Sequence, residues 1–425
     1  MNVHIITLGC SKNTVDSETL TGTLQANGLT VVNDADSASA IVINTCGFID
    51  QAKSESIQTI LEAAELKKNG GIDTLIVAGC LSARYANDLR NEIPEVDHVF
   101  GTEAYEGIAK ALSPDLKYSL LGERTVSTPR GYAYLKISEG CDRPCSFCAI
   151  PLMRGSHRSI PEHDILRQAR SLVSQGAKEL ILIAQDLTFY GLDRTGKRTL
   201  ANLLQMLANE SGAEWIRCMY SFPSGFPMDV IDVMAANDNI CNYLDIPLQH
   251  ASNELLQSMR RGITRERTTD LLNKIREKIP DITLRSTFIV GYPSETEQHV
   301  DELADFLQQH QLDRVGFFPY SREDDTHAFS LGDPIAPEVK EQRIARLMAV
   351  QSEISLEKNI QKISTVKKTL VEEKINSEWL GRTESDAPEV DNEVYIRSAI
   401  PLTPGEFVNV AITDADEFTL FGNLA

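Results

Sequence analysis

Short β-branched runs alternate with helical stretches over about the first 112 residues of the chain. The runs are Val3–Leu8, Ala40–Thr45 and Thr74–Gly79. Such alternation of strand and helix patterns favours a parallel sheet within an α/β layer. The pattern therefore predicts an N-terminal parallel-sheet α/β domain over residues 1–125. Ser113–Arg130 is richer in polar residues and prolines, which indicates a linker.

A second and longer cycle of strand and helix patterns follows the linker. Helical stretches lie between most of its strands, for example His163–Gln175, Leu200–Leu207 and Thr296–Gln309. Six β/α units predict a partial (β/α)6 barrel, whose reactive end is the carboxyl edge of its strands. The candidate strands are Tyr134–Ile137, Glu179–Ala184, Trp215–Tyr220, Tyr243–Ile246, Thr283–Val290 and Arg314–Phe318.

The last part of the chain changes from a helical to an alternating pattern. Glu338–Ile363 has the length of one connecting helix, and an apolar stripe runs along it. From Thr365 onward, short alternating runs broken by Gly and Pro predict a small antiparallel β-barrel. We thus expect an α/β protein of three domains, with bounds at 1–125, 131–363 and 365–425. The stripe consists of Ile344, Leu347, Val350 and Ile354, and the runs include Lys368–Val371, Glu393–Arg397 and Phe407–Ile412.

Composition and charge narrow the class of protein. Hydrophobic residues make up 42% and charged residues 24% of the 425, so the chain is neither disordered nor fibrous. A net charge of -20 argues against a protein that binds bulk nucleic acid. There is no run of 18 apolar residues, and Met1–Cys10 lacks the pattern of a secretory signal. We therefore expect a cytoplasmic protein without a membrane partner, whose eight cysteines remain thiols available for metal.

The strongest chemical signal is a CxxxCxxC cluster formed by Cys141, Cys145 and Cys148, directly after the first predicted barrel strand. Three thiolates on one loop can ligate three irons of a cubane iron-sulfur cluster and leave the fourth iron open to a small molecule. Structural zinc is the alternative, but zinc sites usually close at four ligands, and no His lies inside this loop. Unliganded thiols are a further alternative.

A second set of cysteines follows the strands of the first domain. Cys10, Cys46 and Cys80 are each placed at the carboxyl end of a predicted strand. In a parallel sheet those ends share one edge, so the three thiols can converge there. A single cysteine is usually a buried filler, which is the role we assign to Cys218 and Cys241. Three in one structural setting favour a second open cluster instead.

The CxxxCxxC loop after the first strand of a partial barrel resembles the radical S-adenosylmethionine superfamily. The resemblance implies that the open iron binds S-adenosylmethionine and that reductive cleavage yields a 5′-deoxyadenosyl radical able to attack an unactivated C–H bond. It also implies cosubstrate contacts for Phe147, Gln185 and Arg285. Phe147 has an alternative role as a cover that keeps water from the cluster.

The two cysteine sets together with a small C-terminal β-domain resemble the methylthiotransferase family, from Leu8 to the C-terminus. The tail is similar to a TRAM domain, the usual substrate-binding module of these enzymes. Within the family, four segments resemble the branch that modifies an aspartate of the small-subunit ribosomal protein numbered twelve. One departure is Asp324-Asp325-Thr326, where similar enzymes often carry Glu-Gly-Thr, in a position that touches no proposed ligand. The segments are Leu8–Glu18, Arg154–Ser159, Asp245–Ser252 and Ala387–Asp391.

The charge of the tail offers an independent criterion for the substrate. Thr365–Ala425 contains five basic and 12 acidic residues, a net charge of -7. A module that binds phosphates should be basic, so this tail favours a basic ribosomal protein over RNA. An acidic tail that serves only solubility is the alternative.

The resemblance implies a division of work between two [4Fe-4S] clusters. The cluster of Cys141, Cys145 and Cys148 would generate the radical that removes hydrogen from the aspartate β-carbon. The cluster of Cys10, Cys46 and Cys80 would present the sulfur, and a second S-adenosylmethionine would supply the methyl group. A transfer-RNA methylthiotransferase and a non-catalytic iron-sulfur sensor remain alternatives, and the sulfur source and electron donor remain unknown.

Overall fold

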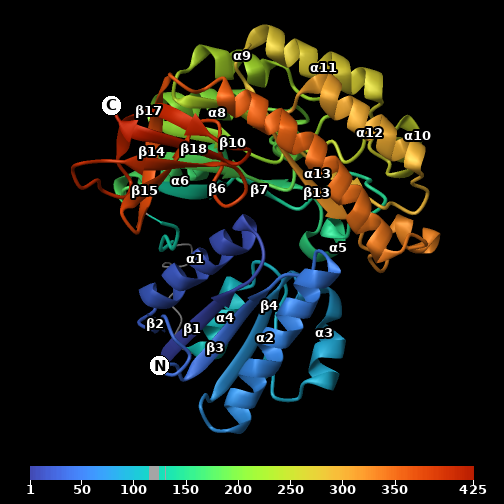
Figure 1. Ribbon diagram of the computed structural model, residues 1–425. Helices are drawn as coiled ribbons and strands as arrows, with labels where there is room; N and C mark the ends of the chain where they lie inside the picture. The colour runs from blue at the N-terminus through green and yellow to red at the C-terminus, as the bar shows by residue number, and fades with distance from the viewer. Residues whose placement is uncertain (114–123, 130) are drawn as a thin grey trace. The chain divides into compact units, whose positions relative to one another are not determined.

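The computed structural model describes residues 1–113, 124–129 and 131–425 of the chain (Figure 1). It contains two compact units. The first comprises residues 1–127, 139–142 and 148–157, and the second comprises residues 128–138, 143–147 and 158–425. The linker expected at Ser113–Arg130 lies largely outside the described residues.

The first unit is built on a five-stranded parallel sheet in the order β2-β1-β3-β4-β5. The predicted α/β layer is confirmed, and two of the three predicted runs match their strands residue for residue. The strands are β1 (Asn2–Thr7), β2 (Thr30–Val32), β3 (Ala40–Thr45), β4 (Thr74–Gly79) and β5 (His98–Val99). The helices are α1 (Ser11–Ala26), α2 (Asp50–Lys68), α3 (Cys80–Glu92) and α4 (Tyr105–Leu112).

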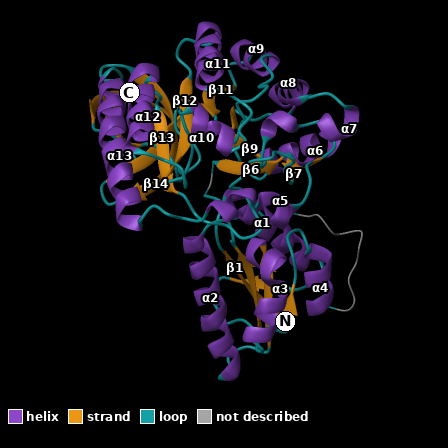
Figure 2. Ribbon diagram, turned by 90° about the vertical axis from the view of Figure 1, so that its right-hand side faces the viewer, coloured by secondary structure: helices purple, strands orange, loops and turns teal. Residues whose placement is uncertain are grey.

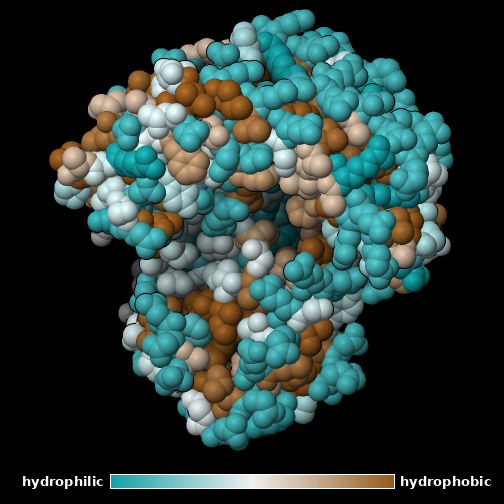
Figure 3. Space-filling model, in the orientation of Figure 1, coloured by the Kyte–Doolittle hydropathy of each residue, from teal (hydrophilic) through white to brown (hydrophobic). Residues whose placement is uncertain are grey.

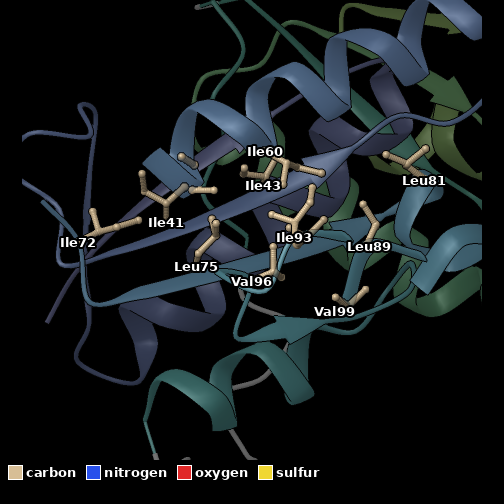
Figure 4. Packing of buried hydrophobic residues seen from close by; sticks show 13 residues of the cluster. Ile41, Ile43, Ile60, Ile72, Leu75, Leu81, Leu89, Ile93, Val96 and Val99 are labelled. Carbon is tan, nitrogen blue, oxygen red and sulfur yellow. The ribbon is translucent and has the colours of Figure 1, made fainter. Parts of the chain in front are cut away.

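Apolar side chains cover both faces of this sheet. On one face, Ile41 and Ile43 of β3 pack with Ile60 of α2 and with residues of β4 and α3 (Figure 4). On the other face, Val42 belongs to a cluster with residues of α1 and α4. Every residue of β3 is buried, as expected for a central parallel strand, which reads as a continuous apolar run because helices cover both of its faces.

The second unit contains a six-stranded parallel sheet in the order β13-β12-β11-β10-β9-β6, which confirms the predicted partial barrel. Successive helices pack side by side, α6 on α8, α8 on α9 and α9 on α11 (Figure 2). The strands are β6 (Tyr132–Lys136), β9 (Glu179–Ile183), β10 (Trp215–Cys218), β11 (Ile240–Asp245), β12 (Thr283–Val290) and β13 (Arg314–Pro319). The helices are α6 (Glu162–Ser174), α8 (Leu200–Glu210), α9 (Asp229–Ala236), α11 (Arg265–Lys278) and α12 (Glu297–His310).

Several short elements connect these larger ones. They are β7 (Ser138–Glu139), α5 (Ile150–Arg154), β8 (Arg158–Ser159), α7 (Leu192–Thr195) and α10 (Asn253–Ser258), together with 3-10 turns at Leu187–Phe189 and His327–Leu331. The stretch between β7 and α5 carries the CxxxCxxC cysteines.

The second unit ends in a closed five-stranded barrel in the order β14-β15-β16-β18-β17. The small antiparallel barrel was predicted, and its strand pairs are antiparallel except for β16 and β18, which pair in parallel. Two strands carried no clear alternating signal and were missed, β15 and β18. The strands are β14 (Val366–Ile375), β15 (Glu378–Thr383), β16 (Glu393–Arg397), β17 (Phe407–Ala415) and β18 (Thr419–Leu424).

The connecting helix α13 (Pro337–Ile360) forms as predicted, but its buried face is only partly apolar. Leu347 and Ile354 are buried, whereas the other two stripe residues are only half-buried. Gln351 is buried and donates to the Leu312 carbonyl at 2.9 Å, and buried Asn359 donates to the Asp416 carbonyl at 2.9 Å. Hydrogen bonds to backbone thus supplement apolar packing along this helix.

The surface over α11 and α12 is mostly hydrophilic on the face shown in Figure 3. Within residues 1–113, 124–129 and 131–425, no helix has both the length and the apolar character needed to cross a membrane.

Candidate functional site: two sets of cysteines

The three cysteines of the first unit follow three neighbouring strands of its sheet. Cys10 comes three residues after the end of β1, Cys46 directly after β3, and Cys80 directly after β4. Since β1, β3 and β4 are adjacent and parallel, their carboxyl ends share one edge. The structure therefore places the three thiols as the strand pattern predicts, with Cys46 and Cys80 buried and Cys10 exposed.

Glycines allow the backbone to turn tightly at this edge. Gly9 and Gly79 directly precede Cys10 and Cys80, and both have positive φ, +94° and +101°. A Cβ at Gly9 would lie 2.8 Å from Cys46 Sγ, and one at Gly79 would lie 2.5 Å from the Thr45 carbonyl oxygen. Both the left-handed backbone and the close approach exclude a side chain at these two positions.

Two of the three thiols, those of Cys46 and Cys80, are buried and lie near a positively charged side chain. Burial raises the pKa of the Cys46 thiol, and it raises the pKa of Cys80 to about 12, although Arg154 opposes that increase. Cys80 also packs with Ala149 and Met153 of the segment around α5. Burial lowers the pKa of Arg154, but nearby Asp16 and the Cys80 thiol outweigh it, so the net pKa lies above its usual range. Arg154 is therefore a permanent cation beside these thiols.

The cysteines of the CxxxCxxC loop are assigned to different compact units. Cys141 and Cys148 belong to the first unit, with Cys141 donating its N–H to the Gly155 carbonyl at 3.0 Å. Cys145 belongs to the second unit and is half-buried. Arg261, buried in the same unit, donates from Nη1 to Cys145 Sγ at 3.1 Å and from Nη2 to the Pro247 carbonyl at 2.5 Å. A charge-assisted donor of this kind stabilises a thiolate or a thiolate-bound cluster.

Aromatic rings support the arginines near Cys145. The Arg261 guanidinium carbon lies 4.0 Å from the ring centre of Phe222, and that of Arg143, within the cysteine motif, lies 3.9 Å from the same ring. Arg143 also lies 3.6 Å from the centre of Phe189 and forms an ion pair with Asp186 at 2.7 Å. Cation–π contacts and the ion pair fix the position of Arg143 in the loop.

The three residues expected to contact the cosubstrate all lie in the second unit. Phe147 packs against a buried apolar cluster that includes Met259 and Tyr292. Gln185 is half-buried and follows the end of β9 by two residues. Arg285 is buried in β12, in register with the last residue of β11.

Arg285 is held by two carboxylates. Its Nη1 donates to Asp245 at 2.9 Å and its Nε to Asp391 at 3.1 Å. Asp391 belongs to the Ala387–Asp391 segment of the C-terminal barrel, and it also accepts from Tyr243 at 2.6 Å. Arg285 thus ties the barrel to the six-stranded sheet in addition to the cosubstrate contact predicted for it.

The donor set of both groups suits iron-sulfur clusters. Each provides three thiols, and soft sulfur ligands favour such clusters over hard-ligand metals. In the part of the chain that the structure describes, no three His, Cys, Asp or Glu side chains are arranged to hold a single metal ion. The other two cysteines, Cys218 and Cys241, are wholly buried inside β10 and β11, as their filler role predicts, and burial raises the pKa of each thiol.

Three polar residues near the cysteines were not identified from the sequence. Asn13 and Arg154 contact the first set, and Arg261 contacts Cys145. Asn13 and Arg154 do lie inside segments noted for their family resemblance, Leu8–Glu18 and Arg154–Ser159, which was the available signal. Arg261 lies 113 residues after Cys148 and had no signal at all, because only the tertiary structure brings it to the loop.

Comparison with known proteins reveals three family matches along the chain. Residues 2–101 match Uncharacterized protein family UPF0004, residues 135–307 match the Radical SAM superfamily, and residues 364–424 match the TRAM domain.

Curated relatives are similar over the full length. The chain is 52% identical over 421 residues to the ribosomal protein uS12 methylthiotransferase RimO of Christiangramia forsetii, covering 99% of this chain and 93% of that protein. It is 52% identical to the RimO of Flavobacterium johnsoniae, covering 100% and 98%. The RimO of Clostridioides difficile is 45% identical, with 100% and 99% covered.

Solved structures with a similar fold are far more distant in sequence. The radical S-adenosylmethionine methyltransferase TsrM of Kitasatospora setae, with cobalamin and a [4Fe-4S] cluster bound, has a TM-score of 0.57 at 15% identity, covering 86% of this chain and 80% of that one. The cobalamin-dependent S-adenosylmethionine radical enzyme OxsB has a TM-score of 0.54 at 16% identity, covering 81% and 56%. At these identities the likeness concerns the fold.

Proposed function

Because the chain belongs to the RimO family of ribosomal protein uS12 methylthiotransferases, we propose that it adds a methylthio group to the β-carbon of an aspartate in protein uS12. The observation that carries the proposal is full-length identity of about half with curated members of that family. The two sets of three cysteines, one at a sheet edge and one on a loop, provide the residues that this reaction requires.

The cofactors are two [4Fe-4S] clusters and S-adenosylmethionine, which when bound supply the electron, the radical and the methyl group. Cys141, Cys145 and Cys148 would hold one cluster. Cys10, Cys46 and Cys80 would hold the other. These ligand sets are proposals that rest on the thiol chemistry and on the placement of each cysteine.

The residues around Cys145 have separate tasks. Arg261 orients Cys145 by donating a hydrogen bond to its sulfur. Phe147, seated on an apolar cluster, would exclude water and pack against the adenine, and Gln185 and Arg285 would contact S-adenosylmethionine. For Arg285 this contact would be additional to its ion pairs with Asp245 and Asp391.

The C-terminal barrel is the candidate binding module for the basic substrate protein. Its net charge of -7 includes three buried charges, those of Arg382, Asp386 and the Asp391 side chain. Among its exposed residues the balance is milder, with five acidic and three basic residues. The five are Glu373, Glu384, Glu389, Glu393 and Asp414, and the three are Lys368, Lys374 and Arg397. This surface still favours a basic partner over phosphates.

The working arrangement we propose has three modules, 1–125, 131–363 and 365–425, acting in the cytoplasm on uS12, alone or within the ribosome. Support for the last boundary comes from the end of α13 at Ile360 and the start of β14 at Val366.

Anaerobic reconstitution tests the function directly. The full chain with iron and sulfide, S-adenosylmethionine, a reductant and purified uS12 should yield a uS12 peptide that gains one methylthio group on an aspartate, detected by mass spectrometry. Cys218→Ala is the matched control, because Cys218 is a buried cysteine with no proposed ligand role. Modification of transfer RNA instead of uS12 would show that the chain is a transfer-RNA methylthiotransferase. Bound clusters without consumption of S-adenosylmethionine would identify a non-catalytic iron-sulfur protein.

A further inference from the structure

A buried network of hydrogen bonds in the first unit begins at Arg154, whose side chain is only 4% exposed. Its Nη1 donates to both carboxylate oxygens of Glu139 at 3.0 Å and to Asp16 Oδ2 at 3.1 Å. Its Nη2 donates to Asn13 Oδ1 at 2.6 Å. One guanidinium therefore joins two acidic side chains and one amide, all of which are buried.

Asn13 extends this network to all three cysteine segments of the sheet edge. It is fully buried, and its Nδ2 donates to the Leu8 carbonyl at 2.6 Å and to the Thr45 carbonyl at 3.1 Å. Leu8 lies two residues before Cys10, and Thr45 directly precedes Cys46. The third cysteine, Cys80, has its Sγ 3.9 Å from Asn13 Oδ1. Asn13 is thus the one described side chain for which the structure gives hydrogen bonds to all three segments.

The other end of the network reaches the segments that flank the CxxxCxxC loop. Glu139 lies two residues before Cys141, and Arg154 lies six residues after Cys148 at the end of α5. Glu139, Cys141, Cys148 and Arg154 all belong to the first unit. The path from Asn13 through Arg154 to Glu139 therefore links the edge that carries one cysteine set to both flanks of the other.

We propose that Arg154 and Asn13 are positioning residues that fix, within the first unit, the spacing between the sheet-edge cysteines and the two loop cysteines Cys141 and Cys148, so that radical formation at one cysteine set is coupled to sulfur transfer at the other. The inference rests on the proposed function and goes beyond it by naming residues that ligate neither cluster. A reaction shared between two centres loses rate steeply when their separation changes, by about 100-fold for an error of 1 Å. A variant with a weakened network should therefore still form 5′-deoxyadenosine, but less of this radical formation should lead to methylthiolated product.

The geometry of the network needs an arginine. The planar guanidinium group donates hydrogen bonds to carboxylates from one nitrogen and to an amide oxygen from the other. The single ammonium group of lysine cannot reach both sets of acceptors. Arg154→Lys keeps the positive charge between Asp16 and Glu139 while removing the second arm, so it avoids leaving two buried carboxylates without a cation. Asn13→Asp keeps the acceptor for Arg154 and removes the two donors to the strand ends.

The experiment measures iron content, 5′-deoxyadenosine and methylthiolated uS12 peptide in the same reconstituted reaction. For Arg154→Lys and Asn13→Asp we expect iron content and 5′-deoxyadenosine formation within about twofold of the unmodified chain, and a rise of about tenfold or more in the ratio of 5′-deoxyadenosine to product. A merely structural role would lower iron, 5′-deoxyadenosine and product together and leave that ratio unchanged.

Matched controls come from the second unit. Arg217→Lys alters another buried arginine, which donates to Glu179 at 2.6 Å. Asn239→Asp alters another asparagine whose Nδ2 donates to two carbonyls, those of Ala208 and Ala213. Neither control should raise the ratio. The inference is overturned if 5′-deoxyadenosine and product fall in parallel in both test variants, or if the ratio of 5′-deoxyadenosine to product rises equally in the controls. An unmodified chain that makes no methylthio product overturns the proposed function itself.

Discussion

Arg382 in the C-terminal barrel donates from Nη2 to Glu179 Oε2 at 2.7 Å, although the two residues are 203 positions apart in sequence. Both side chains are essentially inaccessible to solvent, and Glu179 also accepts from Arg217 at 2.6 Å. Asp386 of the same barrel pairs with Arg314 of β13 at 2.7 Å. The barrel is therefore attached to the six-stranded sheet by buried ion pairs.

Glu179→Gln should destabilise the second unit strongly. The substitution leaves two buried arginines without their shared carboxylate, and loss of one partner of a buried pair costs about 3–5 kcal/mol. Chemical denaturation of the full chain measures the effect. Glu210→Gln is the control, since Glu210 pairs with Arg170 on the surface at 2.8 Å and such pairs contribute about 0–1 kcal/mol. Equal effects of the two substitutions would contradict a stabilising role for the buried pair.

Removal of single cysteines should separate the two reactions. Cys145→Ala should abolish 5′-deoxyadenosine formation, because the cluster proposed to bind S-adenosylmethionine would need all three thiolates of Cys141, Cys145 and Cys148. Cys46→Ala should spare part of that cleavage and stop methylthio transfer. Chromatography of 5′-deoxyadenosine and mass analysis of uS12 measure both. Full methylthio transfer by the Cys46 variant would remove the two-cluster scheme.

Gly79→Ala should disturb the sheet-edge cysteines without touching any thiol. The φ of +101° and the 2.5 Å approach of a Cβ to the Thr45 carbonyl together predict a cost of about 3 kcal/mol or more. We expect the iron bound per chain, measured after reconstitution, to fall by about the content of one cluster. Gly28→Ala is the control, because Gly28 has φ +82° but nothing within 4 Å of its Cβ position, so only the backbone cost of about 1 kcal/mol applies.

His310 should make the stability of the protein depend on pH. Burial lowers its pKa from 6.5 to about 4, helped by Arg276 and Arg265, and its Nε2 lies 3.0 Å from Thr269 Oγ1. The unfolded chain takes up a proton near pH 6.5 and the folded chain only near pH 4. The free energy of unfolding is therefore not reduced by His310 above about pH 6.5. It decreases as the pH falls from about 6.5 toward about 4, because protons then bind the unfolded chain more readily than the folded one.

The measurement for His310 is the free energy of unfolding as a function of pH. His310→Leu should remove a decrease of about 1–2 kcal/mol between pH 6.5 and pH 4. His163→Leu, at a histidine whose side chain is 76% exposed, should leave that decrease in place. An identical pH profile for His310→Leu and the unmodified chain would show that His310 is not the cause.

Strand and helix patterns alone located most elements of the fold. Ala40–Thr45, Thr74–Gly79 and Thr283–Val290 were predicted to the residue. The first two are buried and mostly apolar, a pattern that can be recognised in the sequence alone. Strands β15 and β18 were missed, since closure of a small barrel buries residues such as Gly381 and Gly422 that carry no apolar signal.

The amino-acid sequence by itself determined which thiols come after which strands, and with that the edge at which Cys10, Cys46 and Cys80 gather. Only the tertiary structure decided what surrounds them. The bonds of Asn13 to Leu8 and Thr45, and of Arg154 to Asn13, depend on strand register and on a loop that returns to the sheet from more than 100 residues away. The sequence shows which side chains are polar and will need a hydrogen-bond partner when buried. It does not identify the partner, because hydrogen bonds and ion pairs require relative positions that only tertiary packing specifies.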